Sequence, residues 1–264
     1  MQLQRIRIRW SKQGRVRYVS ARDLSSVWER ALRRADLPIA YSEGFTPHAK
    51  VSFPDALPVG YDSTGEYAEL SFAARIVPER DLARLSATLP EGMDVLTYLE
   101  VPDGAPKLAR MLRATMWELV WPAADAVELT DLLTTRGEAL RAAEHVEVIR
   151  HRPDGDRTID VRPAVLTLAA TTRHADSPHG DGAHTVLRAV LRNDGPTVRP
   201  TDLLSALGGA GGCTPGTGAP SAVDIAAPTR IVRVAQGEAT DDGLREALTG
   251  ETEALVPDVD AEAA

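Results

Sequence analysis

The stretch LQRIRIRW, residues Leu3–Trp10, alternates apolar and charged side chains along the chain. Alternation with a period of two is typical of a β-strand that buries one of its faces. Ile6 and Ile8 lie on one face of this predicted strand, and three arginines lie together on the other. A second short strand is predicted over Arg15–Ser20, after a turn at Gly14.

The next segment, Ala21–Ala35, has the pattern of an amphipathic helix. Ser20 is placed as its N-cap, and Asp23 occupies the capping-box position. Apolar residues recur at spacings of three and four, so we expect one face of the helix to be buried. The other face has four arginines, Arg22, Arg30, Arg33 and Arg34.

The remaining predicted elements of the first half are two strands and a helix, which complete a recognisable order of strands and helices along the chain. A strand is predicted over Gly65–Ala73, a helix over Pro78–Leu89 and a closing strand over Met93–Val101. When the first two strands are counted as one element, the order is strand, helix, strand, strand, helix, strand. This order is the ferredoxin-like pattern.

The same order recurs after a proline-containing joint at Val101–Lys107, with one extra strand. The predicted helices are Ala123–Arg136 and Thr201–Leu207, and the predicted strands are Arg113–Trp121, His145–Arg150, Arg157–Thr171, His184–Arg192 and Arg230–Val234. We therefore predict an α+β fold of two tandem ferredoxin-like (βαββαβ) halves, residues 1–103 and 108–235. Residues 236–264 are predicted to be a flexible, acidic and largely disordered tail with a short helix at Asp242–Leu248.

Composition restricts the class of protein. The 264 residues contain no apolar run of the roughly 18 to 20 residues that cross a bilayer, and we expect no export signal, no membrane association and a cytoplasmic location. The single Cys213 excludes a disulfide within the chain and a cysteine-bound cluster. The histidines match no common metal-binding pattern, so we expect neither a metal nor another cofactor.

The charge distribution is uneven. The net charge is −8, but residues 1–50 contain eleven Lys or Arg against four Asp or Glu, a local balance of +7. A basic end on an acidic protein indicates an anionic partner, although the same charges could simply be solvated.

Ala40–Gly60 is a stiff segment with three prolines and two glycines, next to the basic helix face. Lysine and hydroxyl side chains can bind phosphate, and aromatic rings can stack on nucleic-acid bases. The alternative is that the aromatic residues, including Phe53, belong to the core, that the histidine is structural and that the lysine is solvated. The candidate binding residues here are Tyr41, Ser42, Phe45, Thr46, His48 and Lys50.

Several motifs between Tyr18 and Glu69 resemble those of a bacterial family of domains of unknown function that is linked to radical-SAM proteins. They are S-x-x-D (Ser20, Asp23), R-A-L-R-R-A (Arg30–Ala35), L-P-I-A-Y-S-x-G-F (Leu37–Phe45), P-H-x-K-[VI]-S-F (Pro47–Phe53), L-P-x-G (Leu57–Gly60) and G-E-Y (Gly65–Tyr67).

The domain of that family is either fused behind a radical-SAM domain or encoded separately beside one, and this chain looks like the separate form. The resemblance therefore implies a radical-SAM protein as partner. Two positions depart from the pattern: Ala21 stands where the family often has His, and Ala49 where it often has Pro. If that His were a catalytic base, this chain would lack it. The tandem arrangement is also similar to the repeat-processing endoribonucleases of CRISPR systems, but only at the level of fold.

Three functions remain open at this point. The first is a non-catalytic accessory protein that binds RNA, or another phosphate-bearing substrate, through the basic N-terminal surface and presents it to a radical-SAM enzyme. The second is a metal-independent endoribonuclease or hydrolase, in which His48 acts as general acid or base and Lys50 stabilises charge. The third is a purely protein-binding subunit with a docking tail. The sequence favours no catalytic activity of its own, and it specifies neither the substrate nor the oligomeric state.

Overall fold

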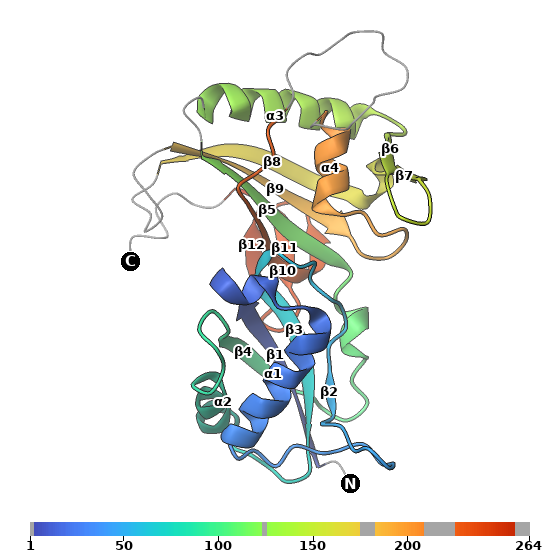
Figure 1. Ribbon diagram of the computed structural model, residues 1–264. Helices are drawn as coiled ribbons and strands as arrows, with labels where there is room; N and C mark the ends of the chain where they lie inside the picture. The colour runs from blue at the N-terminus through green and yellow to red at the C-terminus, as the bar shows by residue number, and fades with distance from the viewer. Residues whose placement is uncertain (1–2, 123–125, 175–182, 209–224, 257–264) are drawn as a thin grey trace. The chain divides into compact units, whose positions relative to one another are not determined.

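The computed structural model describes residues 3–122, 126–174, 183–208 and 225–256 (Figure 1). This part of the chain forms two compact units. The first comprises the residues up to Leu112 together with Val232–Gln236 and Glu246–Glu251, and the second comprises the others. Helices and a mixed sheet occur together, so the predicted α+β class is confirmed. Within the described ranges, no helix is both long and apolar enough to cross a membrane.

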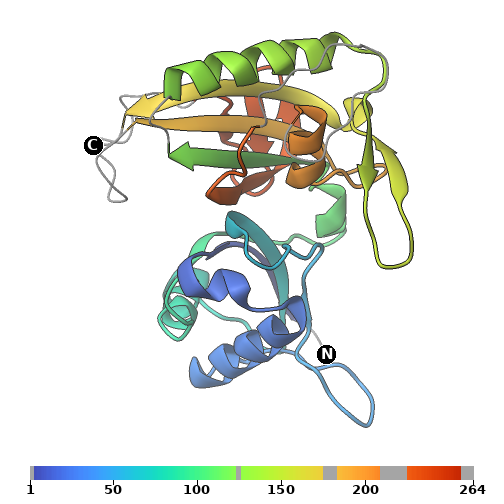
Figure 2. The ribbon, with the colours of Figure 1, turned by 45° about the horizontal axis from the view of Figure 1, so that its top comes forward.

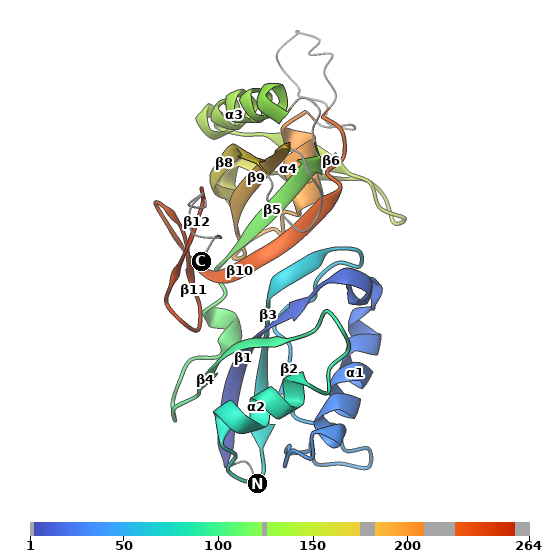
Figure 3. The ribbon, with the colours of Figure 1, turned by 90° about the vertical axis from the view of Figure 1, so that its left-hand side faces the viewer.

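The first unit has a sheet with two helices, α1 and α2, on one face (Figure 3). Its strands run antiparallel in the order β4-β1-β3. Beyond β3, Val51 of β2 pairs with Leu70, and Val232 of β10 pairs in parallel with Asp62. The elements are β1 (Gln4–Lys12), α1 (Ala21–Arg34), β2 (Val51–Ser52), β3 (Asp62–Phe72), α2 (Pro78–Ser86), β4 (Val95–Glu100) and the 3-10 turn η2 (Leu108–Arg110).

The core of the first unit follows from the alternation in β1. Ile6 pairs with Leu70 and Ile8 pairs with Ala68, and all four side chains are fully buried beneath the helices. The opposite face of β1 is charged. Arg7 on this face is also buried. Its guanidinium group donates to Glu69 (2.9 Å) and to the carbonyl group of Pro106, and these bonds offset the cost of burying the charge.

The second unit is a sheet in the order β10-β5-β9-β8, with α3 packed on β8 and β9 (Figure 2). Gly137 of α3 lies so close to β8 that a Cβ atom on it would be 2.4 Å from Leu168 Cδ1. The elements are β5 (Ala114–Pro122), α3 (Ala126–Ala142), β6 (Glu147–Arg150), β7 (Arg157–Asp160), the 3-10 turn η3 (Arg162–Ala164), β8 (Val165–His174), β9 (Ala183–Arg192), α4 (Pro200–Ala206), β10 (Arg230–Thr240), β11 (Gly243–Glu246) and β12 (Thr252–Ala254).

Two predicted strands differ from the structure. The strand predicted over Arg15–Ser20 is wrong, because Gly14–Tyr18 forms the 3-10 helix η1, which buries only Val16. The single long strand predicted over Arg157–Thr171 is divided into β7 and β8 by the turn that contains Pro163.

The predicted disordered tail is wrong for its described residues, which extend to Val256. The expected helix Asp242–Leu248 is instead a strand, β11, followed by a turn, and β11 pairs with β12. This arrangement requires glycine at position 243, because the φ there is +153° and a Cβ atom would lie 2.1 Å from the carbonyl oxygen of Glu253. Leu244 is fully buried. The last eight residues, 257–264, lie outside the described residues.

Candidate anion-binding surface

Helix α1 forms where the sequence predicts it. The Ser20 side chain accepts a hydrogen bond from the backbone N–H of Asp23 (3.2 Å), and its hydroxyl group donates to the Asp23 carboxylate (2.7 Å). These contacts satisfy one of the free N–H groups of the first turn. Trp28 and Leu32 face the sheet and are fully buried. The helix ends before Asp36, which has a φ of +47°.

The opposite face of α1 presents arginines. All four predicted side chains are exposed, and at 100° per residue they fall within an arc of about 120° around the helix. From the first to the last they cover about 18 Å along the axis. We call this set the α1 arginine stripe: Arg22, Arg30, Arg33 and Arg34.

Few carboxylates oppose the stripe. Arg33 Nη2 lies 3.9 Å from Glu29 Oε2, in an exposed pair that contributes little to stability. Among the residues that the structure describes, no hydrogen bond or ion pair involves the side chains of Arg22, Arg30 or Arg34. Arg33 and Arg34 lie in the last turn, where cations also offset the helix dipole. That effect does not account for Arg22 and Arg30, which lie farther from the C-terminus.

The segment between α1 and β2 forms a loop over residues 41–49, which we call the 41–49 loop. The backbone N–H of Ser42 donates to the carbonyl oxygen of His48 (2.8 Å), and the backbone N–H of His48 donates to Ser42 Oγ (3.0 Å). Lys50 N–H donates to the carbonyl oxygen of Ala40 (2.7 Å) and closes the base of the loop. Gly44, with φ of +131°, permits the turn at the tip. Figure 2 shows the loop extending beyond the end of the sheet.

The three aromatic residues of this segment have different environments. Phe53 packs against Trp10 and Trp28 at ring-centroid distances of 6.3 and 6.1 Å, so it belongs to the core. Tyr41 is 43% exposed, and Phe45, at the tip, is completely exposed. The core alternative therefore applies to Phe53 but not to the two loop residues. Thr46, beside Phe45, is exposed as well.

His48 lies next to α1, and Lys50 is exposed with no side-chain hydrogen bond or ion pair among the described residues. His48 Nδ1 is 3.9 Å from Glu29 Oε1, on the carboxylate that also faces Arg33. Ala49 and Val51 both pack against the core that α1 covers. Side chains alternate along extended backbone, so both His48 and Lys50 face away from that core. The structure thus brings the loop to the stripe through His48, and a contribution of Lys50 to the same surface remains a prediction.

The sequence analysis missed a buried ionic cluster in the first unit. Arg233, which is 3% exposed, donates to Glu66 (3.1 Å) and to Asp55 (2.8 Å). Lys12, also buried, donates to the carbonyl oxygen of Val19 (2.9 Å). Burial lowers the pKa of Lys12, although the nearby Glu66 carboxylate opposes this effect. Only the charges of Glu66 and Arg233 inside predicted strands could have signalled the cluster, and these two residues are far apart in sequence.

The cluster consists of charges that neutralise one another, which is how buried charges are normally stabilised. It is therefore best explained as part of the packing between β3 and the start of β10. In the described ranges, no group of three or more His, Cys, Asp or Glu side chains could hold a metal ion.

Comparison with known proteins places the chain in a family. Residues 5–200 match the family described as "Uncharacterized protein conserved in bacteria (DUF2344)". The chain belongs to this family. The DUF2344 match includes both the α1 arginine stripe and the 41–49 loop. No curated protein matches the chain.

Two solved structures are similar to the DUF2344 chain at low scores. An unknown protein from Galdieria sulphuraria is 12% identical, with a TM-score of 0.22, over 77% of this chain and 86% of that one. A Cas6 protein in a substrate mimic complex is 19% identical, with a TM-score of 0.19, over 78% of this chain and 89% of that one. Both TM-scores are far below 0.5, so neither likeness supports a conclusion about fold or function.

Proposed function

We propose that this DUF2344 protein binds RNA, or another phosphate-bearing substrate, through the α1 arginine stripe and the 41–49 loop. The observation that supports the proposal best is the position of Arg22 and Arg30. Both are exposed on one arc of α1 and lack a carboxylate partner among the described residues. Guanidinium groups bind phosphate oxygens in pairs, and the exposed Phe45 ring offers a face on which a base can stack.

The substrate would be presented to a separately encoded radical-SAM enzyme, with the DUF2344 protein as a non-catalytic cytoplasmic accessory. This part of the proposal rests on the motif resemblance between Tyr18 and Glu69. A division of labour suits a chain whose single cysteine is too few to hold an iron–sulfur cluster by itself.

The two alternatives have weaker support. A hydrolase would need His48 held in position as general acid or base, but its side chain is 70% exposed and its ion-pair partner Glu29 lies 3.9 Å away. A purely protein-binding subunit would use Phe45 as an apolar anchor, but the exposed arginines of α1 favour an anionic ligand.

We further propose that both units are elaborated ferredoxin-like halves. In the first unit the chain order β1, α1, β2, β3, α2, β4 agrees with this pattern, and so does a sheet with β4 next to β1 and β2 next to β3. In the second unit β10, β5, β9 and β8 occupy the equivalent places, with the β6–β7 hairpin as an insertion. An experimental structure with a different strand order would contradict this assignment.

The binding proposal is tested by fluorescence anisotropy with labelled single-stranded RNA at about 50 and 200 mM salt. Replacing three cations of the stripe, in R22Q/R30Q/R34Q, should weaken binding. Each phosphate contact that is lost should also flatten the slope of log affinity against log salt by about 0.7.

The matched control is the triple variant R75Q/K107Q/R110Q. It removes the same charge from exposed positions of the first unit that have no ion pair in the described part. We expect it to retain most of the affinity. Equal losses in the two triple variants would show diffuse attraction rather than a site, and no binding by the wild type at low salt would reject the RNA proposal.

The partner is tested by affinity purification from the native bacterium, with identification of the bound proteins. A radical-SAM enzyme should be recovered with the wild-type chain. Its absence under mild conditions would contradict the accessory role while leaving the RNA measurements unaffected.

A further inference from the structure

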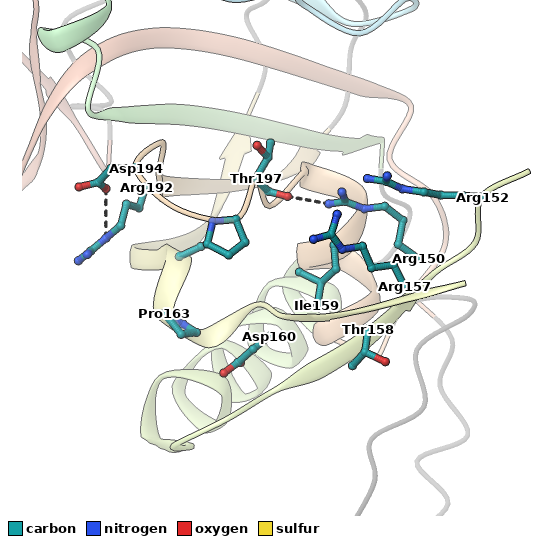
Figure 4. A pocket seen from close by; sticks show the side chains of 12 residues that line it. Arg150, Arg152, Arg157, Thr158, Ile159, Asp160, Pro163, Arg192, Asp194 and Thr197 are labelled. Carbon is teal, nitrogen blue, oxygen red and sulfur yellow. Dashed lines mark hydrogen bonds and ion pairs between the residues drawn. The ribbon is translucent and has the colours of Figure 1, made fainter. Parts of the chain in front are cut away.

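A pocket of about 490 Å³ lies in the second unit, beside the β6–β7 hairpin (Figure 4). The hairpin, the η3 turn and the segment after β9 form its walls. Pockets for small molecules commonly measure about 300 to 1,000 Å³. Four arginines line it: Arg150, Arg152, Arg157 and Arg192.

Arg150 is a fixed part of the wall. Its side chain is 9% exposed, and its guanidinium group makes two bonds to the Asp202 carboxylate, one of them at 3.1 Å. It also donates to the carbonyl oxygen of Thr197 (2.8 Å). These bonds connect the hairpin to α4 and to the segment before it, and therefore hold the pocket in shape. They also neutralise Arg150, so its own charge does not attract a ligand strongly.

The positive charges of the other three arginines are neutralised weakly or not at all by carboxylates. Arg152 and Arg157 are in no ion pair with any of the described residues. Arg192 Nε lies 3.6 Å from Asp194 Oδ1, but both side chains are about half exposed and this contact is weak. Figure 4 shows the guanidinium groups of Arg150, Arg152 and Arg157 gathered at one end of the view. Gathered like charges repel one another, so an anion in the pocket would relieve that repulsion.

The second acidic residue of the lining is engaged by other donors. Asp160 accepts hydrogen bonds from His145 Nδ1 (2.8 Å) and from the backbone N–H groups of Val146 (3.0 Å) and Arg162 (3.1 Å). Burial raises the pKa of Asp160, but these hydrogen bonds lower it by more, so the group stays ionised. Its carboxylate therefore belongs to this local network and does not neutralise the arginines.

The rest of the lining is apolar. Ile159 and Ala164 are buried, and Pro163 and Pro196 complete a surface without charge. A ligand that fits both parts needs an anionic group for the arginines and a compact body for the apolar side. The planar fork of arginine donates two parallel hydrogen bonds to carboxylate or phosphate oxygens, but a phosphate group has the larger charge and more oxygens, so it can be bound by several arginines at once.

We propose that this pocket binds a phosphorylated small molecule of about the size of a nucleotide. Arg152 and Arg157 bind its phosphate groups, and Arg150 fixes the wall behind them. The apolar surface formed by Ile159, Ala164 and the two prolines contacts the body of the molecule. The site lies within the second unit, so it is independent of the function proposed for the α1 arginine stripe.

The experiment is calorimetric titration of the full chain with adenosine diphosphate, pyrophosphate and adenosine at low salt. Adenosine diphosphate and pyrophosphate should bind, and adenosine, which has no phosphate, should not. R152Q and R157Q should each weaken the binding of adenosine diphosphate by about tenfold or more, because each removes a charged hydrogen-bond donor.

The matched control is R245Q, an exposed arginine of the second unit that is outside the pocket. It should leave affinity within about twofold, which separates a site from general attraction to the protein. Equal losses in R245Q and the pocket variants would overturn the proposal. So would binding of adenosine as tight as that of adenosine diphosphate, or failure of both phosphate compounds to bind at millimolar concentration.

Discussion

The hydroxyl group of Tyr67 donates a hydrogen bond of 2.5 Å to the Glu246 carboxylate, which is 179 positions farther along the chain. Both residues are buried, with 2% of each exposed. Glu246 also accepts hydrogen bonds from the backbone N–H groups of Leu248 (3.0 Å) and Thr249 (2.6 Å). Burial, together with the Glu246 carboxylate, raises the pKa of Tyr67. The segment Glu246–Glu251 is thus an internal part of the first unit.

Removing either partner of this contact should destabilise the protein. Y67F deletes the hydrogen bond to Glu246 and the weaker one that the hydroxyl accepts from the Gln236 backbone N–H (3.3 Å), so it should lower the free energy of unfolding by about 1–2 kcal/mol. E246A removes the acceptor of the Tyr67 hydroxyl and leaves the backbone N–H groups of Leu248 and Thr249 without their partner, so its cost should be larger, about 3 kcal/mol. Urea denaturation followed by circular dichroism measures both. The control E251A removes an exposed acid of the same segment and should change stability by less than about 0.5 kcal/mol. Equal costs for E246A and E251A would contradict the buried contact.

Sequence patterns predicted those parts of the fold that depend on near neighbours. The alternation around Ile6 and Ile8 gave β1, and the spacing of buried residues gave α1 and the position of the arginine stripe. The different environments of Tyr41, Phe45 and Phe53 were not predictable, because they depend on how the segment folds back and pairs with β3. The described part of the tail, residues 236–256, was misjudged for a related reason. Its acidic composition indicates disorder, but Glu246 is stabilised by donors that only the folded unit brings together.

Close backbone packing at Gly65 leads to a second prediction. A Cβ atom at Gly65 would lie 2.6 Å from Ala235 Cα and 2.8 Å from the carbonyl oxygen of Val234. These are backbone atoms of β10, which cannot move without disturbing the strand. G65A should therefore lower the free energy of unfolding by about 1–3 kcal/mol.

Gly137 provides the comparison for Gly65. A Cβ atom there would meet Leu168 Cδ1 at 2.4 Å, which is the end of a flexible side chain. Alanine also stabilises a helix relative to glycine by about 1 kcal/mol. G137A should thus cost clearly less than G65A in the same denaturation experiment. A larger loss in G137A would show that the leucine cannot move aside.

Asp81, in the first turn of α2, should make the free energy of unfolding depend on pH in the acidic range. Asp81 accepts hydrogen bonds from Arg80 Nε (3.1 Å) and from the backbone N–H of Val77 (2.9 Å). The bond from Arg80 is the main cause that holds the pKa of Asp81 below its usual value of 3.8. The folded state therefore binds this proton more weakly than the unfolded state does. The resulting stabilisation is fully present above pH 3.8 and is lost as the pH falls through the lower pKa of the folded state.

D81N tests this assignment, because asparagine does not titrate. Its free energy of unfolding should be lower than that of the wild type near neutral pH, and the difference should shrink below about pH 4. Urea denaturation over a series of pH values measures this. A difference between wild type and variant that stays constant down to about pH 2 would show that Asp81 has no altered pKa.

Substitutions of the two phenylalanines before β3 should have separate effects, one on the stability of the protein and the other on RNA binding. Phe53 packs on Trp10 and Trp28, so F53A should lower the free energy of unfolding by about 2–3 kcal/mol. Phe45 is completely exposed, so F45A should leave stability within about 0.5 kcal/mol. If a base stacks on Phe45, F45A should also weaken RNA binding by about 1–3 kcal/mol. Denaturation and anisotropy on the same protein samples measure the two effects. Unchanged RNA affinity in F45A, with the stripe variants still impaired, would restrict the binding surface to the arginines of α1.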